Sequence, residues 1–203
     1  MINIFQPSLG EQELQAVKEV FESNWIGAGP KTKKFEEQFS KFISSDPDKV
    51  MMTNSCTEGM FQICDVLLSP GDEVIIPTIG FVGAANAVIG NGGTPVFCDV
   101  DLRSLNTTAK DIEEKITDKT KAVLLIHYAG WACDMDPIIE LCKEKDILII
   151  EDSACSVATT YKGQPVGTLG DFGVWSFDSM KILVTGDGSI IHAKDPSILK
   201  NIK

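Results

Sequence analysis

The sequence has few of the residues that build metal centres, disulfide frameworks or nucleic-acid-binding surfaces. Only two histidines are present and none of the six cysteines forms a Cys-x-x-Cys pair, so neither a metal site nor a disulfide scaffold is predicted. Most cysteines are expected to be reduced core thiols. There are 18 basic and 29 acidic residues, and the formal net charge of -11 argues against a nucleic-acid partner.

A long apolar run and a basic leader are also missing. The residues after Met1 show neither feature, so we expect no signal peptide, no membrane span and a cytoplasmic protein. With 203 residues, 43% of them hydrophobic and 23% charged, the chain has the composition of one globular domain.

The first 45 residues are predicted to form a helical segment. Apolar side chains recur at helical spacing over residues 11–22 and 31–43, which indicates two amphipathic helices. Residues 25–30 form a turn-rich link between them.

Beyond this segment, short apolar runs alternate with helical patterns. Continuous Val/Ile/Leu runs of this kind predict a mostly parallel sheet with helices on both faces, which is a three-layer αβα fold of the α/β class. The predicted strands include 50–52, 74–76, 95–97, 122–126, 148–150, 173–177 and 189–192, and the predicted helices between them are 58–67, 82–89, 109–116 and 137–145.

Residues of distinct chemistry follow five of these strands. Ligands of such sheets bind where the carboxyl ends of the strands meet, so these residues are expected to lie at one edge. They are Ser55, Cys56 and Thr57 after the first strand, Phe81 after the second, and then His127 with Tyr128, Asp152, and Lys181.

Lys181 is the candidate for a Schiff-base amine. Between Lys162 and Lys194 there is no other lysine or arginine, and Lys181 lies in a loop that ends in Gly186-Asp187-Gly188. A desolvated lysine has a lowered pKa and becomes a nucleophile toward carbonyls. The alternative is a surface lysine in a turn. The apolar residues expected to surround it are Val174, Trp175, Ile182, Leu183 and Val184.

An anion site is predicted at Ser55, Cys56 and Thr57, because N–H and hydroxyl groups between a strand and a helix suit a phosphate. A helix N-cap is the alternative. Asp152 ends a buried strand, where its carboxylate needs a cationic or N–H partner. A pyridinium nitrogen is one such partner, and a helix cap or a metal ligand is the alternative.

Three further residues are candidates for the lining of the site. Phe81 can stack on a flat ring, although core packing is the commoner role of such an aromatic. Ser176 lies five residues before Lys181 and could add a phosphate contact, or it is an exposed serine at a strand end. His127 is interpreted as a pocket-wall residue rather than an acid or base.

In this chain order, the anion site, aromatic, carboxylate and lysine resemble the fold-type I pyridoxal-phosphate enzymes, and more closely the DegT-type sugar aminotransferases. The resemblance runs nearly end to end. Its blocks include 27–31, 70–74, 85–88, 94–101, 133–136, 150–154 and 161–163.

The resemblance implies a role for each site residue. Lys181 would hold pyridoxal 5'-phosphate as a Schiff base and move the substrate proton, Asp152 would pair with the pyridine nitrogen, and Phe81 would lie against the ring. Cys155 stands where many members carry a glutamine that contacts the cofactor's phenolic oxygen. The phosphate would be held by Ser55, Cys56, Thr57 and Ser176.

By the same resemblance, glutamate would donate an amino group that a nucleotide-linked keto-sugar receives, for surface polysaccharide or amino-sugar biosynthesis. A homodimer is implied. Residues 1–203 would be the cofactor-binding large domain, with residues 1–45 as its helical segment and the family's smaller C-terminal domain absent.

Two alternatives stay open. The chain could be a catalytically silent remnant that serves as an oligomerisation or interaction module. It could also be another fold-type I enzyme, such as a lyase or aldolase, because the lysine, aspartate and phosphate site are shared among them. A related dehydratase branch has histidine in place of the lysine, so Lys181 counts against that reaction.

Overall fold

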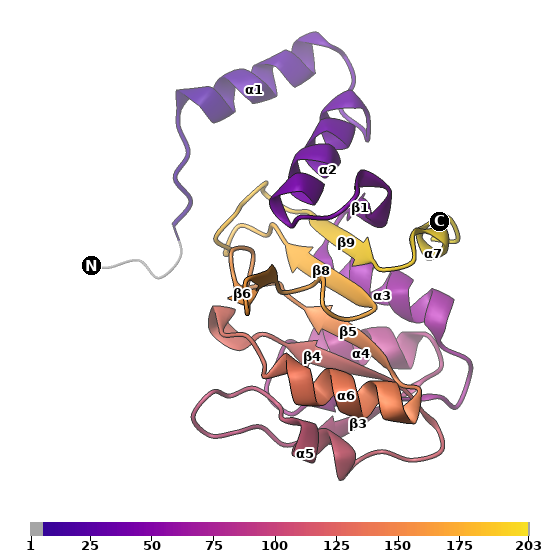
Figure 1. Cartoon of the computed structure of the whole chain (residues 1–203). Coiled ribbons are helices and arrows are strands. Elements are labelled where there is room, and N and C mark those ends of the chain that lie inside the picture. Colours follow the sequence, from indigo (N-terminus) through magenta and orange to yellow (C-terminus); the bar gives the residue numbers. More distant parts are fainter. Residues whose placement is uncertain (1–5, 203) are drawn as a thin grey trace.

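A computed structural model describes residues 6–202, which are built around one seven-stranded sheet (Figure 1). The strand order is β1-β9-β8-β5-β4-β2-β3. Strand β9 runs antiparallel to both of its neighbours, and the other four pairings are parallel. The prediction of a mostly parallel sheet is therefore confirmed. The strands are β1 Val50–Thr53, β2 Glu73–Pro77, β3 Thr94–Cys98, β4 Thr120–Ile126, β5 Leu148–Asp152, β8 Phe172–Ser176 and β9 Ser189–Ala193.

Helices cover both faces of the sheet, as the αβα prediction requires. Helices α3 and α4 lie on one face, and α5 and α6 lie on the other (Figure 1). Helix α2 covers β1, β8 and β9 through an aromatic cluster in which Phe39 packs edge-on against Trp175 and Phe177. The helices are α1 Glu11–Glu22, α2 Pro30–Phe42, α3 Cys56–Leu67, α4 Val82–Gly90, α5 Ala109–Glu113, α6 Met135–Lys145 and α7 Pro196–Leu199, with short 3-10 turns η1 Pro47–Lys49 and η2 Tyr128–Gly130.

Alternate residues of the central strands enter different layers. Val74 and Ile76 of β2 pack with α3 and α4, whereas Ile75 packs with α5 and α6. This follows from the two-residue period of a strand, and it is why both faces of a buried strand must be apolar. A two-stranded hairpin, β6 Thr160–Tyr161 and β7 Gln164–Pro165, lies between β5 and β8 in the chain and was not predicted.

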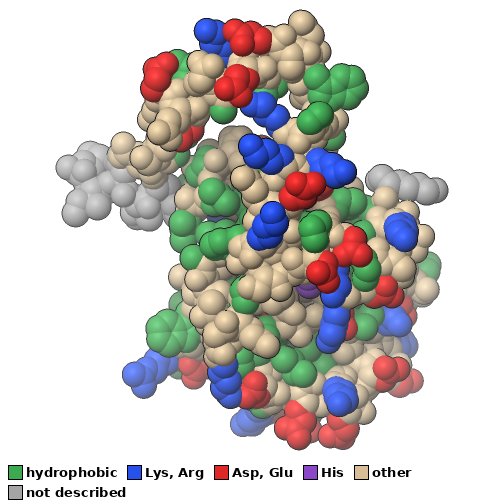
Figure 2. Space-filling model, turned by 45° about the horizontal axis from the view of Figure 1, so that its top comes forward, with side chains coloured by type: hydrophobic (Ala, Val, Ile, Leu, Met, Phe, Trp, Pro, Cys, Tyr) green, Lys and Arg blue, Asp and Glu red, His purple; other side chains and the backbone are tan. Residues whose placement is uncertain are grey.

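Helix α1 has the predicted bounds, but it buries no residue against the rest of the described chain. Its apolar residues Leu14, Val17 and Phe21 are 61%, 49% and 66% exposed. The helix stands apart from the sheet and its layers (Figures 1 and 2). Its amphipathic pattern therefore predicts the helix correctly but has no packing partner among residues 6–202.

The surface and termini add two observations. Figure 2 shows acidic and basic side chains interspersed over the face that it presents. Within residues 6–202, no helix combines the length and apolar character needed to span a bilayer. The expectations about residues 1–5 and 203 lie outside the described residues.

His192 joins helix α2 to the sheet. It is buried on β9, and its Nε2 lies 2.9 Å from the hydroxyl of Ser45, just after α2. Its buried Nδ1 has no hydrogen-bond partner among the described residues. Burial lowers the pKa of His192 to about 4; the nearby Lys49 also lowers it, and Glu151 opposes the shift.

We predict that His192 makes stability depend on pH. Between about pH 4 and 6.5, the unfolded chain binds a proton at this ring that the folded chain excludes, so the free energy of unfolding rises with pH. Urea unfolding of wild type and His192→Gln checks this. From pH 4.5 to 7.5 the wild-type value should rise by about 2 kcal/mol more than the variant's. Parallel pH profiles would contradict the assignment.

Candidate active site

A cavity of about 680 Å³ opens at the carboxyl edge of the sheet. Most of its lining comes from the ends of β2, β4, β5 and β8 and the segments that follow them, and includes Phe81, Tyr128, Asp152, Cys155 and Lys181. Gln6 also lines it. Residues from four separate strand ends therefore share one cavity, which is the position where open parallel sheets bind ligands.

Asp152 is the last residue of β5 and is buried. Its Oδ1 accepts a hydrogen bond of 2.9 Å from the Ala154 N–H. Burial raises the pKa of Asp152, while that N–H and the neighbouring Lys181 and His127 act in the opposite direction. The charged form of the carboxyl group is therefore destabilised, and a cation in the cavity would stabilise it.

Lys181 lies in the loop between β8 and β9, and its Nζ donates to the Cys155 Sγ at 3.4 Å. Bonds from the Lys181 and Met180 N–H groups to Asp178 shape the loop. The predicted apolar enclosure of Lys181 is wrong. Ile182 is 78% exposed and Leu183 is 38% exposed, and the lysine itself is half-buried. Val174 and Trp175 belong to the core because they lie within β8.

The start of α3 lies beside the cavity but outside its lining. Ser55 is the N-cap, and its hydroxyl accepts the Glu58 N–H at 3.2 Å. The first helical N–H groups, those of Cys56 and Thr57, have no acceptor within residues 6–202. Burial raises the pKa of Cys56, Asp152 raises it further, and Lys181 lowers it, so this helix end is within electrostatic reach of both.

Two more predicted site residues differ in burial, because Phe81 is exposed and Ser176 is buried. Phe81 is 65% exposed at the N-cap of α4. A Cβ added at Gly83 would lie 2.9 Å from its ring and 3.0 Å from the Thr57 hydroxyl, so the missing side chain lets these two groups approach each other. Ser176 is buried at the end of β8, outside the cavity lining, and its hydroxyl accepts a long hydrogen bond of 3.4 Å from Asp178.

The sequence reading missed the role of Glu151, which precedes Asp152 on β5 and is fully buried. Its Oε1 accepts the N–H groups of Leu169 and Gly170 at 2.8 and 2.6 Å. Its Oε2 accepts the Gly167 N–H at 2.7 Å and lies 2.9 Å from the His127 Nε2. A charged residue in the last positions of an otherwise apolar strand was the signal that could have identified the structural role of Glu151.

His127 is committed to structure at both ring nitrogens. Its Nδ1 accepts the Cys133 N–H at 3.1 Å, so Nε2 is the nitrogen that donates to Glu151. The ring is fully buried. His127 therefore holds the cavity wall and has no nitrogen free for proton transfer, in agreement with the pocket-wall interpretation.

All six cysteines are free thiols. Four are buried in the core, Cys56 is half-buried, and Cys155 is exposed at the cavity. Within residues 6–202 no group of three or more histidine, cysteine or carboxylate side chains is arranged to hold a metal ion.

We predict that Asp152→Asn stabilises the chain without ligand. Because burial raises the pKa of Asp152, its negative charge costs folding free energy at neutral pH, and asparagine removes that charge. Urea unfolding at pH 7.5 should show a gain on the order of 1 kcal/mol. The gain should shrink toward pH 4, where the wild-type carboxyl is increasingly protonated in both states. A loss of stability at pH 7.5 would refute this reading.

Comparison with known proteins gives a consistent picture. The sequence profile of the DegT/DnrJ/EryC1/StrS aminotransferase family matches residues 7–203. The dTDP-4-dehydro-2,3,6-trideoxy-D-glucose 4-aminotransferase of Saccharopolyspora spinosa is 52% identical over 98% of this chain and 52% of its own length. The chain therefore spans about half the length of this curated relative.

Solved structures agree on the fold. The aminotransferase TlmJ from Streptoalloteichus hindustanus superposes with a TM-score of 0.96 at 51% identity, over 99% of this chain and 55% of that one. An E. coli GDP-4-keto-6-deoxy-D-mannose-3-dehydratase with bound hydrated PLP gives a TM-score of 0.91 at 26% identity, over 98% and 53%. The chain belongs to the DegT/DnrJ/EryC1/StrS aminotransferase family.

Proposed function

We propose that this chain is the cofactor-binding large domain of a pyridoxal-phosphate-dependent aminotransferase. Its reaction moves an amino group from glutamate to a nucleotide-linked keto-sugar, for surface polysaccharide or amino-sugar biosynthesis. The observation that carries the proposal is that Lys181 and the buried Asp152 share one cavity. The sugar assignment is supported by the relative that is named as a 4-aminotransferase of a dTDP-linked dehydro-sugar.

The residues that line the cavity or lie beside it fit pyridoxal phosphate in three respects. The buried Asp152 carboxyl, with its raised pKa, gains from a protonated ring nitrogen. The unpaired N–H groups of Cys56 and Thr57 at the start of a 12-residue helix suit a phosphate. Lys181 contributes a primary amine, and its positive charge lowers the pKa of both Asp152 and Cys56.

When bound, the cofactor supplies an electron sink for the carbanion formed at the substrate carbon. The Lys181 Nζ is the amine that would hold the cofactor, and it would also move the proton at the substrate carbon. The Asp152 carboxylate keeps the proton on the ring nitrogen. The Cys155 Sγ lies 3.4 Å from the Lys181 Nζ, so Cys155 would lie close to the bound cofactor.

The phosphate would be held by the Cys56 and Thr57 N–H groups together with the hydroxyl protons of Ser55 and Ser176. The Ser55 oxygen accepts the capping bond of α3, and its proton is free to donate. The exposed ring of Phe81 lies near Thr57 and provides a flat apolar surface for the cofactor ring.

We also propose which domain the chain forms, how it assembles and where in the cell it acts. The described chain corresponds to the cofactor-binding large domain, with α1 and α2 as its helical segment. The exposed apolar side chains of α1, and Trp25 and Ile26 after it, support a homodimer in which the segment packs on a second copy. The protein acts in the cytoplasm.

We predict that pyridoxal phosphate added to the chain gives a visible absorption band shifted from that of the free cofactor. Lys181→Ala should abolish the band because it removes the amine. Lys162→Ala is the matched control, since Lys162 is an exposed lysine paired with Asp136 and lies outside the cavity lining. The control should retain the band.

The contrary outcomes are distinct. No band at any cofactor concentration with the wild-type chain would favour the silent interaction module. A band that survives Lys181→Ala would assign the amine to another lysine. A band without release of 2-oxoglutarate from glutamate would point to another fold-type I reaction.

A further inference from the structure

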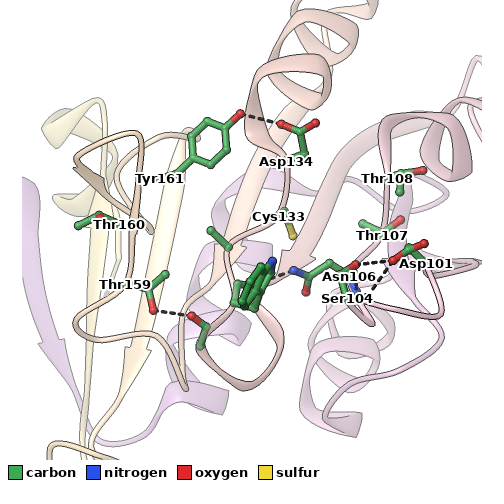
Figure 3. Close-up of a pocket in the computed structure, with 13 residues that line it drawn as sticks. Asp101, Ser104, Asn106, Thr107, Thr108, Cys133, Asp134, Thr159, Thr160 and Tyr161 are labelled. Carbon is green, nitrogen blue, oxygen red and sulfur yellow. Dashed lines mark hydrogen bonds between the residues drawn. The ribbon is translucent and has the colours of Figure 1, made fainter.

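Residues 127–131 form a wall between two cavities. His127, Tyr128 and Ala129 line the cavity that contains Lys181, whereas Gly130 and Trp131 line a neighbouring cavity of about 620 Å³ (Figure 3). Ala129 and Gly130 have φ values of 51° and 85°, in the left-handed region. A non-glycine residue such as Ala129 is strained there, so the surrounding structure must hold this conformation.

Asn106 reaches this wall from the loop between β3 and α5. It is 3% exposed, and its amide bonds two backbone atoms that bracket the left-handed residues. Its Oδ1 accepts the Tyr128 N–H at 2.9 Å, and its Nδ2 donates to the Trp131 carbonyl at 2.9 Å. In Figure 3 the Asn106 side chain extends toward this backbone, with the bond drawn.

The chemistry of the residue type matters here. An asparagine side chain offers an acceptor and a donor in one plane, so it can replace the two halves of a peptide group. Aspartate keeps only the acceptor, and alanine keeps neither. The Asn106 backbone is itself fixed, because its carbonyl accepts the Asp101 N–H at 2.9 Å.

Other side chains hold the same wall at single points. The Ser156 hydroxyl donates to the His127 carbonyl at 2.9 Å, and the Thr159 hydroxyl donates to the Gly130 carbonyl at 2.7 Å. Both belong to the segment after β5. Among residues 6–202, Asn106 is the side chain that bonds the wall on both sides of Ala129 and Gly130.

We propose that Asn106 is a positioning residue of the candidate active site. Its amide fixes Tyr128 and Ala129 in the lining of the cavity that contains Lys181, although Asn106 itself lines only the neighbouring cavity. This inference rests on the proposed function, because it assigns to the wall the task of confining the cofactor and substrate.

The test compares Asn106→Ala and Asn106→Asp with a matched control, Asn91→Ala. The Asn91 Nδ2 also donates to two backbone carbonyls, those of Phe61 and Ala87, and Asn91 lies at the C-terminal end of α4. Two measurements are made on each chain. One is the exchange rate of the Tyr128 amide proton by NMR without ligand, and the other is the pyridoxal-phosphate dissociation constant by absorbance.

For Asn106→Ala we expect Tyr128 amide exchange and the dissociation constant each to rise by about tenfold, because two buried hydrogen bonds are lost. Asn106→Asp should keep the Tyr128 amide protected, since its acceptor remains, and should weaken cofactor binding by a smaller factor. Asn91→Ala should change neither quantity by more than about twofold, even where it lowers the unfolding temperature.

Equal cofactor affinity in Asn106→Ala and Asn91→Ala would overturn the positioning role. Unchanged Tyr128 exchange in Asn106→Ala would also overturn it, because the amide would then not hold the wall. A wild-type chain that gives no band with pyridoxal phosphate would contradict the proposed function, and Tyr128 exchange would then decide by itself whether Asn106 fixes the wall.

Discussion

The buried carboxylate of Glu151 is the constraint on which the rest of the site depends. A charge without water needs matched donors, and Glu151 has three backbone N–H groups and the His127 ring. These bonds tie the loop of residues 167–170 and the wall that begins at His127 to β5. Because successive strand residues point to opposite faces, fixing Glu151 also fixes Asp152 on the side of α3 and Lys181.

Two glycines allow the backbone of the loop to approach the Glu151 carboxylate. Gly167 has a φ of 88°, which favours glycine, and its N–H is one of the donors to Glu151. A Cβ at Gly173 of β8 would lie 1.9 Å from the Gly167 carbonyl oxygen. The loop can therefore cross β8 closely enough to reach the carboxylate only because position 173 has no side chain. Two glycines and one carboxylate form a single structural unit.

The sequence predicted the sheet, its covering helices and the convergence of Asp152 and Lys181, because apolar runs and strand-end positions follow from chain-local rules. It could not predict the environment of Lys181, since flanking Ile182 points to solvent rather than over the amine. The His127–Glu151 pair spans 24 residues and depends on the parallel register of β4 and β5. The role of Asn106 could not be predicted either, because it depends on contacts with Tyr128 and Trp131, which lie 22 and 25 residues further along the chain. The apolar stripe of α1 does not indicate what covers it.

The role of the Glu151 carboxylate is tested most directly by the unfolding free energy of Glu151→Gln. Glutamine has nearly the same shape, but its NH₂ group would face backbone N–H donors, leaving buried groups unpaired. We expect a loss of about 3 kcal/mol in urea unfolding at neutral pH, with weaker pyridoxal-phosphate binding. A variant within about 0.5 kcal/mol of wild type, with unchanged cofactor affinity, would contradict the central role of this carboxylate.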